Sequence, residues 1–165
     1  LAISPPMLEL PAGERQLIRI IRTGAPAAGV EAAYRVLVDE LPPDTPLEGG
    51  GLRFAMRYSV PVFVLPAGDA PVRHELATRL ERNGAQAVLV ATNNGNQHAQ
   101  IADLFWTTDG GARTPVIAGL VGYVLPGQTM RWALPATLPA DDGHLLARIN
   151  GEPEEQTLAM DPAGR

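Results

Sequence analysis

Residues 51–66 read GLRFAMRYSVPVFVLP, and large apolar side chains occupy every second position over most of this stretch. An extended strand has a side-chain period of two, so one face of the strand should be apolar and the other polar or small. The residues of the apolar face are Leu52, Phe54, Met56, Tyr58 and Val60. Such a face packs either against the core of its own domain or against a partner that lacks a strand. The stretch by itself leaves both alternatives open.

The rest of the chain is also predicted to form short strands joined by turns. Its 17 glycines and 16 prolines in 165 residues punctuate it too often for long helices. Residues 31–41 contain helix-favouring Ala, Leu and Glu, but their alternation favours a strand. The expected strands are Ala2–Leu10, Arg15–Arg22, Glu31–Leu41, Leu52–Val64, Glu75–Arg82, Gln86–Asn93, His98–Thr107, Thr114–Val116, Thr129–Leu134, His144–Asn150 and Gln156–Met160. We therefore predict an all-β fold of antiparallel sandwich type.

A Pro, Ala, Gly and Asp-rich stretch around Pro66–Val72 interrupts this pattern and is predicted to be a linker. It divides the chain into residues 1–66 and residues 67–165. The full length of 165 residues suits one ordinary domain or two small ones of roughly 70–90 residues each.

Composition argues against several classes of protein. The formal charge of −5, with no dense basic cluster, argues against a nucleic-acid partner. No apolar run is long enough for a membrane span, so the chain is not predicted to be membrane-embedded. Cysteine is absent, which excludes disulfides and thiolate metal sites within the chain. The three histidines, His74, His98 and His144, have no ligand spacing and are predicted to be surface residues.

The sequence also lacks the signatures of common enzymes. It contains no phosphate-binding glycine loop and no nucleophile elbow, and its two serines, Ser4 and Ser59, are not at strand-to-helix turns. The adjacent carboxylates Asp39-Glu40 and Asp141-Asp142 should point to opposite faces of a strand. We expect no catalytic residues, no metal and no cofactor.

Asn93-Asn-Gly-Asn96 is a strong turn signal, although its amides could also bind sugar hydroxyls. The turn is the favoured interpretation.

Several segments, in order, carry a family resemblance: LAISPPMLELPAGERQLIRIIRTG, EAAYRVLVDELPP, LRFAMRYSVPVFVLP, ATNNGNQHAQIADL and GLVGYVLPGQTMRWALP. Together they resemble the periplasmic pilus-assembly chaperones of the chaperone–usher pathway. The short loop at Pro42–Gly51 and the RYSVPVFV strand resemble the archaic branch, which serves spore-coat-protein-U-like pilins. The resemblance implies two immunoglobulin-like β-sandwich domains, a location in the periplasm and no enzymatic activity.

The resemblance also implies a mechanism, donor-strand complementation. The chaperone lends a strand to a pilus subunit that lacks one, prevents premature polymerisation and delivers the subunit to an outer-membrane usher. On this sequence the donated side chains are Leu52, Phe54 and Met56, with Tyr58 as a fourth candidate. Free relatives can cover the donor strand by self-association, which is therefore expected as an additional contact.

Members of the family anchor the subunit's C-terminal carboxylate with basic residues, and this sequence departs from their pattern. Arg35 is the candidate substitute, expected to lie opposite Arg57–Ser59, and Arg19 is a weaker candidate. A solvated strand arginine is the equally open alternative for Arg35. Glu31 matches an acidic residue that joins an interdomain ion-pair network in some relatives, without clear partners here.

Relatives have three further strands before LAISPP, so the first domain is expected to be incomplete at its N-terminus. Two other functions remain as alternatives. The first is a structural pilus subunit or adhesin, although Pro5-Pro6 interrupts the extension that a subunit should carry. The second is a carbohydrate-binding β-sandwich module, for which Trp106, Trp132 and Tyr123 would be the aromatic platform.

Overall fold

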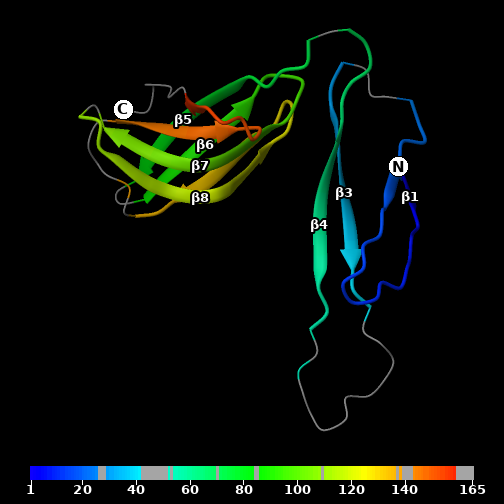
Figure 1. The fold of residues 1–165 in the computed structure, drawn as a ribbon. Coiled ribbons are helices and arrows are strands. Elements are labelled where there is room, and N and C mark those ends of the chain that lie inside the picture. The colour runs from blue at the N-terminus through cyan, green and yellow to red at the C-terminus, as the bar shows by residue number, and fades with distance from the viewer. Residues whose placement is uncertain are drawn as a thin grey trace.

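The computed structural model describes residues 1–25, 29–41, 52, 54–69, 71–83, 86–108, 110–136, 138 and 143–158 (Figure 1). All regular elements within these residues are strands, which confirms the all-β prediction. The strands are β1 (Ala2–Ser4), β2 (Arg19–Ile21), β3 (Ala32–Asp39), β4 (Arg57–Val64), β5 (Leu76–Asn83), β6 (Gln86–Asn93), β7 (Ala99–Thr108), β8 (Arg113–Val124), β9 (Thr129–Leu134), β10 (Gly143–Ile149) and β11 (Glu155–Thr157). The described part of the chain contains no helix long and apolar enough to cross a membrane.

Strands β5 to β11 form a two-layer sandwich, seen at the left of Figure 1. One layer has the strand order β5-β6-β9 and the other has the order β11-β10-β7-β8, with antiparallel pairing throughout. Between the layers lies a continuous apolar core. Its most deeply buried large side chains are Leu89, Ile101, Leu104, Leu145 and Ile149. This part of the chain therefore buries its own apolar faces.

Strands β1 to β4 form two separate two-stranded sheets, β1-β2 and β3-β4. In the longer hairpin, eight residues of β3 pair with eight of β4, from Ala32 opposite Val64 to Asp39 opposite Arg57. Most large apolar side chains here remain exposed, and Val36, at 8% exposure, is the buried apolar one among those described. This half of the molecule presents apolar surface that the sandwich half does not.

Strand β8 is much longer than the Thr114–Val116 segment predicted, because Gly119 and Gly122 are part of the strand. The register between β7 and β8 shifts around Asp103, which has φ 50°, and Gly119, which has φ 73°. The Gly119 amide donates to the Asp103 carboxylate at 2.8 Å, which stabilises this β-bulge. At Gly122 a Cβ atom would lie 2.9 Å from the Trp132 ring, so only glycine lets β8 approach β9 so closely.

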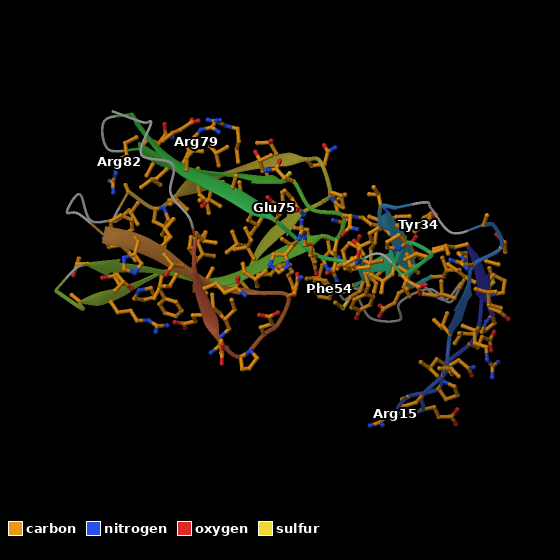
Figure 2. All side chains as sticks on the ribbon, turned by 90° about the horizontal axis from the view of Figure 1, so that it is seen from above. Arg15, Tyr34, Phe54, Glu75, Arg79 and Arg82 are labelled. Atoms are coloured by element: carbon orange, nitrogen blue, oxygen red, sulfur yellow. The ribbon has the colours of Figure 1, made fainter. Side chains whose placement is uncertain are left out.

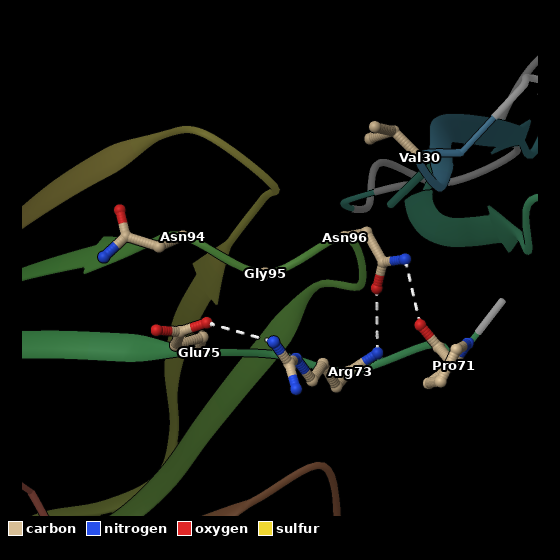
Figure 3. Close-up of a pocket in the computed structure, with 7 residues that line it drawn as sticks. All are labelled: Val30, Pro71, Arg73, Glu75, Asn94, Gly95 and Asn96. Atoms are coloured by element: carbon tan, nitrogen blue, oxygen red, sulfur yellow. Dashed lines mark hydrogen bonds and ion pairs between the residues drawn. The ribbon is translucent and has the colours of Figure 1, made fainter.

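Strand β6 ends at Asn93, and the chain then bends at residues 95–97, close to the predicted turn, where it holds the linker (Figure 3). The Asn96 carboxamide accepts from the Arg73 amide at 2.8 Å and donates to the Pro71 carbonyl at 3.1 Å. In return, the Asn96 amide donates to the Arg73 carbonyl at 2.9 Å. A Cβ at Gly95 would lie 2.3 Å from that same carbonyl oxygen. Glycine at position 95 is therefore required for the linker to pack on the bend.

Asn93 stabilises the bend from within the sandwich and is fully buried. Its side-chain oxygen accepts from the amides of Glu75 and Gly95, and its nitrogen donates to the carbonyls of Gln97 and Val124. These four bonds occupy the carboxamide on all sides, so Asn93 is a structural residue. A sugar-binding role for this amide is excluded by its burial.

Candidate functional site

The apolar segment that precedes β4 is the most exposed apolar feature of the chain. Leu52 is 87% exposed, Phe54 is 82% exposed and Met56 is 50% exposed. Figure 2 shows Phe54 and Tyr34 on the half of the molecule opposite to the end of the sandwich that carries Arg79 and Arg82. The described residues therefore do not bury these three side chains in a core of their own domain.

Strand β4 begins at Arg57, five residues later than predicted, and the first donor candidates lie before it. Polar contacts fix this transition. Arg57 forms a bidentate ion pair with Asp39, at 2.5 and 3.1 Å, and the hydrogen bond and charge of Asp39 raise the pKa of Arg57. The Met56 amide donates to the Glu40 carboxylate at 3.1 Å, and the Met56 carbonyl accepts from the Glu40 amide at 2.9 Å. Among the described residues, the last contacts between the two arms of the hairpin are those at Met56, and Leu52 and Phe54 precede them in the chain.

Tyr58 occupies a different position from the other three candidates. It lies within β4 opposite Val38, on the same face of the hairpin as Val36. Its side chain is 45% exposed, and its hydroxyl is 3.4 Å from the Met56 sulfur. Tyr58 therefore shares the face on which the hairpin buries Val36, while Leu52 and Phe54 lie outside the residue pairs described for the hairpin.

A charged and aromatic joint connects the two halves of the molecule. The Glu31 side chain is fully buried, and its carboxylate accepts from the His98 amide at 3.1 Å and lies 2.8 Å from the His98 Nδ1 atom. The Glu31 amide donates to the Asn96 carbonyl at 2.9 Å, in the same bend that holds the linker. Phe63 of β4 stacks on the His98 ring at 3.6 Å, with Tyr123 tilted beside both rings.

The contacts at this joint show that the prediction for His98 was wrong, and they identify the partners of Glu31. His98 was expected to be a surface histidine, but it is largely buried as the partner of Glu31. No partner for Glu31 could be identified from the sequence, because neither His98 nor Phe63 has a spacing that indicates this contact. Because residues 31 and 98 are far apart in the chain, their contact depends on how the two halves meet.

Next to the joint lies a cleft of about 840 Å³ whose walls come from both halves. Strands β3 and β4 form one wall, and β8, β9 and the connection between them form the other. The cleft is lined by Val30, Glu31, Ala33, Tyr34, Arg35, Ser59, Pro61, Phe63, Leu120, Gly122, Tyr123, Leu125, Pro126, Gln128 and Met130. Arg35 contributes the positive charge among these lining residues, and the Glu31 carboxylate is already engaged by His98.

The two arginines proposed to bind a carboxylate lie in different places. Arg35 lines the cleft and donates to the Ser59 hydroxyl at 3.1 Å. Its pairing partner is Pro61, two residues beyond the Arg57–Ser59 range that was expected, because the hairpin pairs Asp39 with Arg57. Arg19 begins β2 opposite Ser4, and the cleft lining does not include it.

The geometry gives little support to a metal site or to a sugar-binding site. The described residues contain no group of three or more His, Cys, Asp or Glu side chains that could hold a metal ion. Trp106 is only 3% exposed and belongs to the sandwich core, so it cannot serve in an aromatic platform for sugars. The Asp141-Asp142 pair lies outside the described residues.

Comparison with known proteins agrees with these features. Residues 1–69 match the family model described as "Pili and flagellar-assembly chaperone, PapD N-terminal domain". The chain is 29% identical over 105 residues to the "Probable fimbrial chaperone YehC" of Escherichia coli strain K12. That match covers 62% of this chain and 44% of the relative, so the chain spans less than half of the relative's length.

A similar fold occurs in the crystal structure of the CsuC-CsuE chaperone–tip adhesion subunit pre-assembly complex, from the archaic chaperone-usher Csu pili of Acinetobacter baumannii. The TM-score is 0.63 at 24% identity, over 94% of this chain and 71% of the other. This likeness supports the predicted immunoglobulin-like β-sandwich architecture. Together with the family match, it confirms the resemblance predicted from the sequence. Residues 1–69 therefore match the N-terminal domain of the pilus-assembly chaperone family, and 105 residues of the chain are similar to a probable fimbrial chaperone.

Proposed function

We propose that this protein is a periplasmic chaperone that binds pilus subunits by donor-strand complementation and delivers them to an outer-membrane usher. The segment formed by Leu52, Phe54 and Met56 would complete the fold of a subunit that lacks its last strand, with Tyr58 at the end of the contact. Binding would require no nucleotide, metal or cofactor, and the protein would not act as an enzyme. The archaic branch is the proposed subgroup, and residues 1–66 and 67–165 are the proposed domains.

The observation that carries this proposal is the exposure of the alternating apolar side chains before β4. Strand β4 pairs with β3 along one edge, and no other described strand pairs with its second edge. An unpaired edge supplies backbone hydrogen bonds that tolerate any partner sequence, while alternate side chains fill apolar pockets. Burying three such side chains is worth on the order of 5–8 kcal/mol before the cost of ordering. That energy is sufficient to hold a subunit that is otherwise unstable.

Arg35 is the proposed anchor for the C-terminal carboxylate of the subunit, because it lies in the cleft and carries a guanidinium that can bind a carboxylate bidentately. Arg19 is the weaker candidate, since it lies outside the cleft lining. In the free protein, self-association through the exposed segment would cover the same apolar surface.

The proposal is tested by co-expression with a pilus subunit that lacks its final strand, followed by affinity capture of the soluble complex. The variant Phe54→Asp with Met56→Asp places two charges in the donated segment and should abolish capture. Its matched control is Leu17→Asp with Ile21→Asp, which alters two exposed apolar residues outside the segment and should leave capture intact. Survival of the complex with the first variant would show that the donor assignment is wrong.

A further inference from the structure

The donor segment, formed by Leu52, Phe54 and Met56, carries one chemically reactive side chain. Leu52 and Phe54 are hydrocarbons, whereas Met56 carries a thioether, which oxidants convert to a sulfoxide. Met56 is 50% exposed, so small solutes reach its side chain. The chain contains no cysteine, so methionine is the sulfur-containing residue type that a peroxide meets. The segment therefore combines an apolar contact surface with an oxidisable group.

The methionines of the chain lie in different parts of the molecule. Met7 is 74% exposed and lies in the connection between β1 and β2. Met130 is 39% exposed and lies on β9 of the sandwich. Met160 is outside the described residues. Among the described methionines, Met56 alone belongs to the donor segment, and Met7 supplies a more exposed comparison elsewhere.

Backbone contacts hold Met56 at its place in the segment. Its amide donates to the Glu40 carboxylate at 3.1 Å, and its carbonyl accepts from the Glu40 amide at 2.9 Å. The next residue, Arg57, is paired with Asp39 and begins β4. Met56 cannot move away from the hairpin without breaking both of its backbone bonds. Its exposed side chain therefore projects from a fixed backbone position.

Tyr58 supplies a polar partner for an oxidised Met56. The Tyr58 hydroxyl lies 3.4 Å from the Met56 sulfur, and the two side chains share a face because they are two residues apart in an extended segment. A thioether sulfur is a weak hydrogen-bond acceptor, whereas a sulfoxide is polar. Oxidation would therefore strengthen this contact in the free protein. A subunit that covers Met56 would then have to bury a polar group.

We propose that Met56 is a site of peroxide oxidation whose sulfoxide blocks subunit binding. Hydrogen peroxide transfers one oxygen atom to the sulfur, which is oxidised to the sulfoxide, and the peroxide is reduced to water. The polar sulfoxide is disfavoured in an apolar pocket, so an oxidised donor segment binds the subunit weakly. A bound subunit, in turn, shields Met56 from the oxidant. The inference rests on the proposed function, because it requires this segment to be the donor.

The first test oxidises the free protein with hydrogen peroxide, removes the peroxide with catalase and adds the subunit of the co-expression test from denaturant. Peptide mass spectrometry gives the sulfoxide content at each methionine, and gel filtration gives the yield of soluble complex. Conversion of Met56 should lower this yield about tenfold. Treatment with the two stereospecific methionine sulfoxide reductases and dithiothreitol should restore it.

Variants assign the effect to one sulfur atom. Met56→Leu keeps a large apolar side chain without an oxidisable group, so its yield of complex should be the same with and without peroxide. Met7→Leu is the matched control and should remain sensitive to peroxide. Met56→Gln places a polar side chain of similar length in the segment and should lower the yield without any oxidant. Full yield from protein whose Met56 is oxidised, or an equal loss in Met56→Leu after peroxide, would overturn the inference.

A second test separates this inference from the proposed function. The soluble complex is treated with peroxide, and the oxidation rates of Met56 and Met7 are compared with those in the free protein. The subunit should slow oxidation of Met56 by about tenfold and leave Met7 unchanged. If Met56 is shielded but its sulfoxide leaves binding intact, the inference is wrong and the proposed function stands. If Met56 is oxidised as fast in the complex as in the free protein, the donor assignment is wrong and the proposed function fails.

Discussion

The two halves of this molecule use apolar residues in opposite ways. In the sandwich of β5 to β11, the large apolar side chains converge on a core that contains fully buried residues such as Leu104 and Leu145. In the strands β1 to β4, Val36 is the buried apolar residue among those described, and Leu52 and Phe54 are almost fully exposed. Since apolar exposure costs free energy in water, the second pattern suits a surface that is covered by a partner. The comparison separates a half with a buried apolar core from a half whose large apolar side chains are mostly exposed.

The largest expected effect is on the free energy of unfolding, and it tests this difference between the two halves. Leu104→Ala removes a fully buried side chain and should lower the free energy of unfolding by about 2–5 kcal/mol. Leu52→Ala, at an 87% exposed position, should change it by less than about 0.5 kcal/mol. Urea unfolding followed by tryptophan fluorescence measures both. Equal losses for the two variants would refute the division between a half with a buried core and a half with exposed apolar side chains.

The next effect concerns the bend that joins the halves. Gly95→Ala would place a methyl group 2.3 Å from the Arg73 carbonyl oxygen and 2.7 Å from the Glu75 nitrogen, both backbone atoms that move only with the linker. We expect a loss of about 3 kcal/mol and faster hydrogen exchange at the Asn96 and Gln97 amides, which donate to Arg73. Gly24→Ala, where no atom lies within 4 Å of the added methyl group, is the control.

A smaller effect is expected from the buried carboxylate of the joint. Glu31→Gln keeps the shape of the side chain but removes its charge and one of the two oxygens that contact the His98 ring nitrogen. The free energy of unfolding should fall by about 1–2 kcal/mol, because a buried polar contact becomes incompletely paired. Thermal unfolding measures the loss. Glu75→Gln, whose ion pair with Arg73 is long and exposed, should have no measurable effect.

The smallest expected effect lies on the exposed outer layer of the sandwich. Hydrogen bonds from Arg131 and then Arg79 lower the pKa of Glu81 below its ordinary value. A carboxyl group whose pKa is lower in the folded state contributes stability at neutral pH, and this contribution is lost as the pH falls through the folded pKa. A ¹³C titration of the Glu81 carboxyl should give a midpoint below that of an unfolded glutamate. In Arg131→Gln this midpoint should rise, and an unchanged midpoint would contradict the assignment.

The sequence predicted the local elements better than the contacts between them. Strands β6 and β9 have the predicted bounds, since each alternates clearly and ends at turn residues. Strand β8 was largely missed because Gly119 and Gly122 have the sequence character of a turn, while in the fold they form a bulge and a close approach. His98 had no recognisable spacing. Its contacts with Glu31 and Phe63 depend on long-range packing, which periodicity does not encode.

The bend at residues 95–97 has a consequence for motion between the halves. Asn96 bonds the linker through Arg73 and the start of the β3 hairpin through Glu31. A rotation that widens the cleft must therefore break both sets of bonds together. Opening should be cooperative, with the amides of Glu31 and Asn96 exchanging in a single step, so the width of the cleft is set by the bend and not by independent motion of its walls.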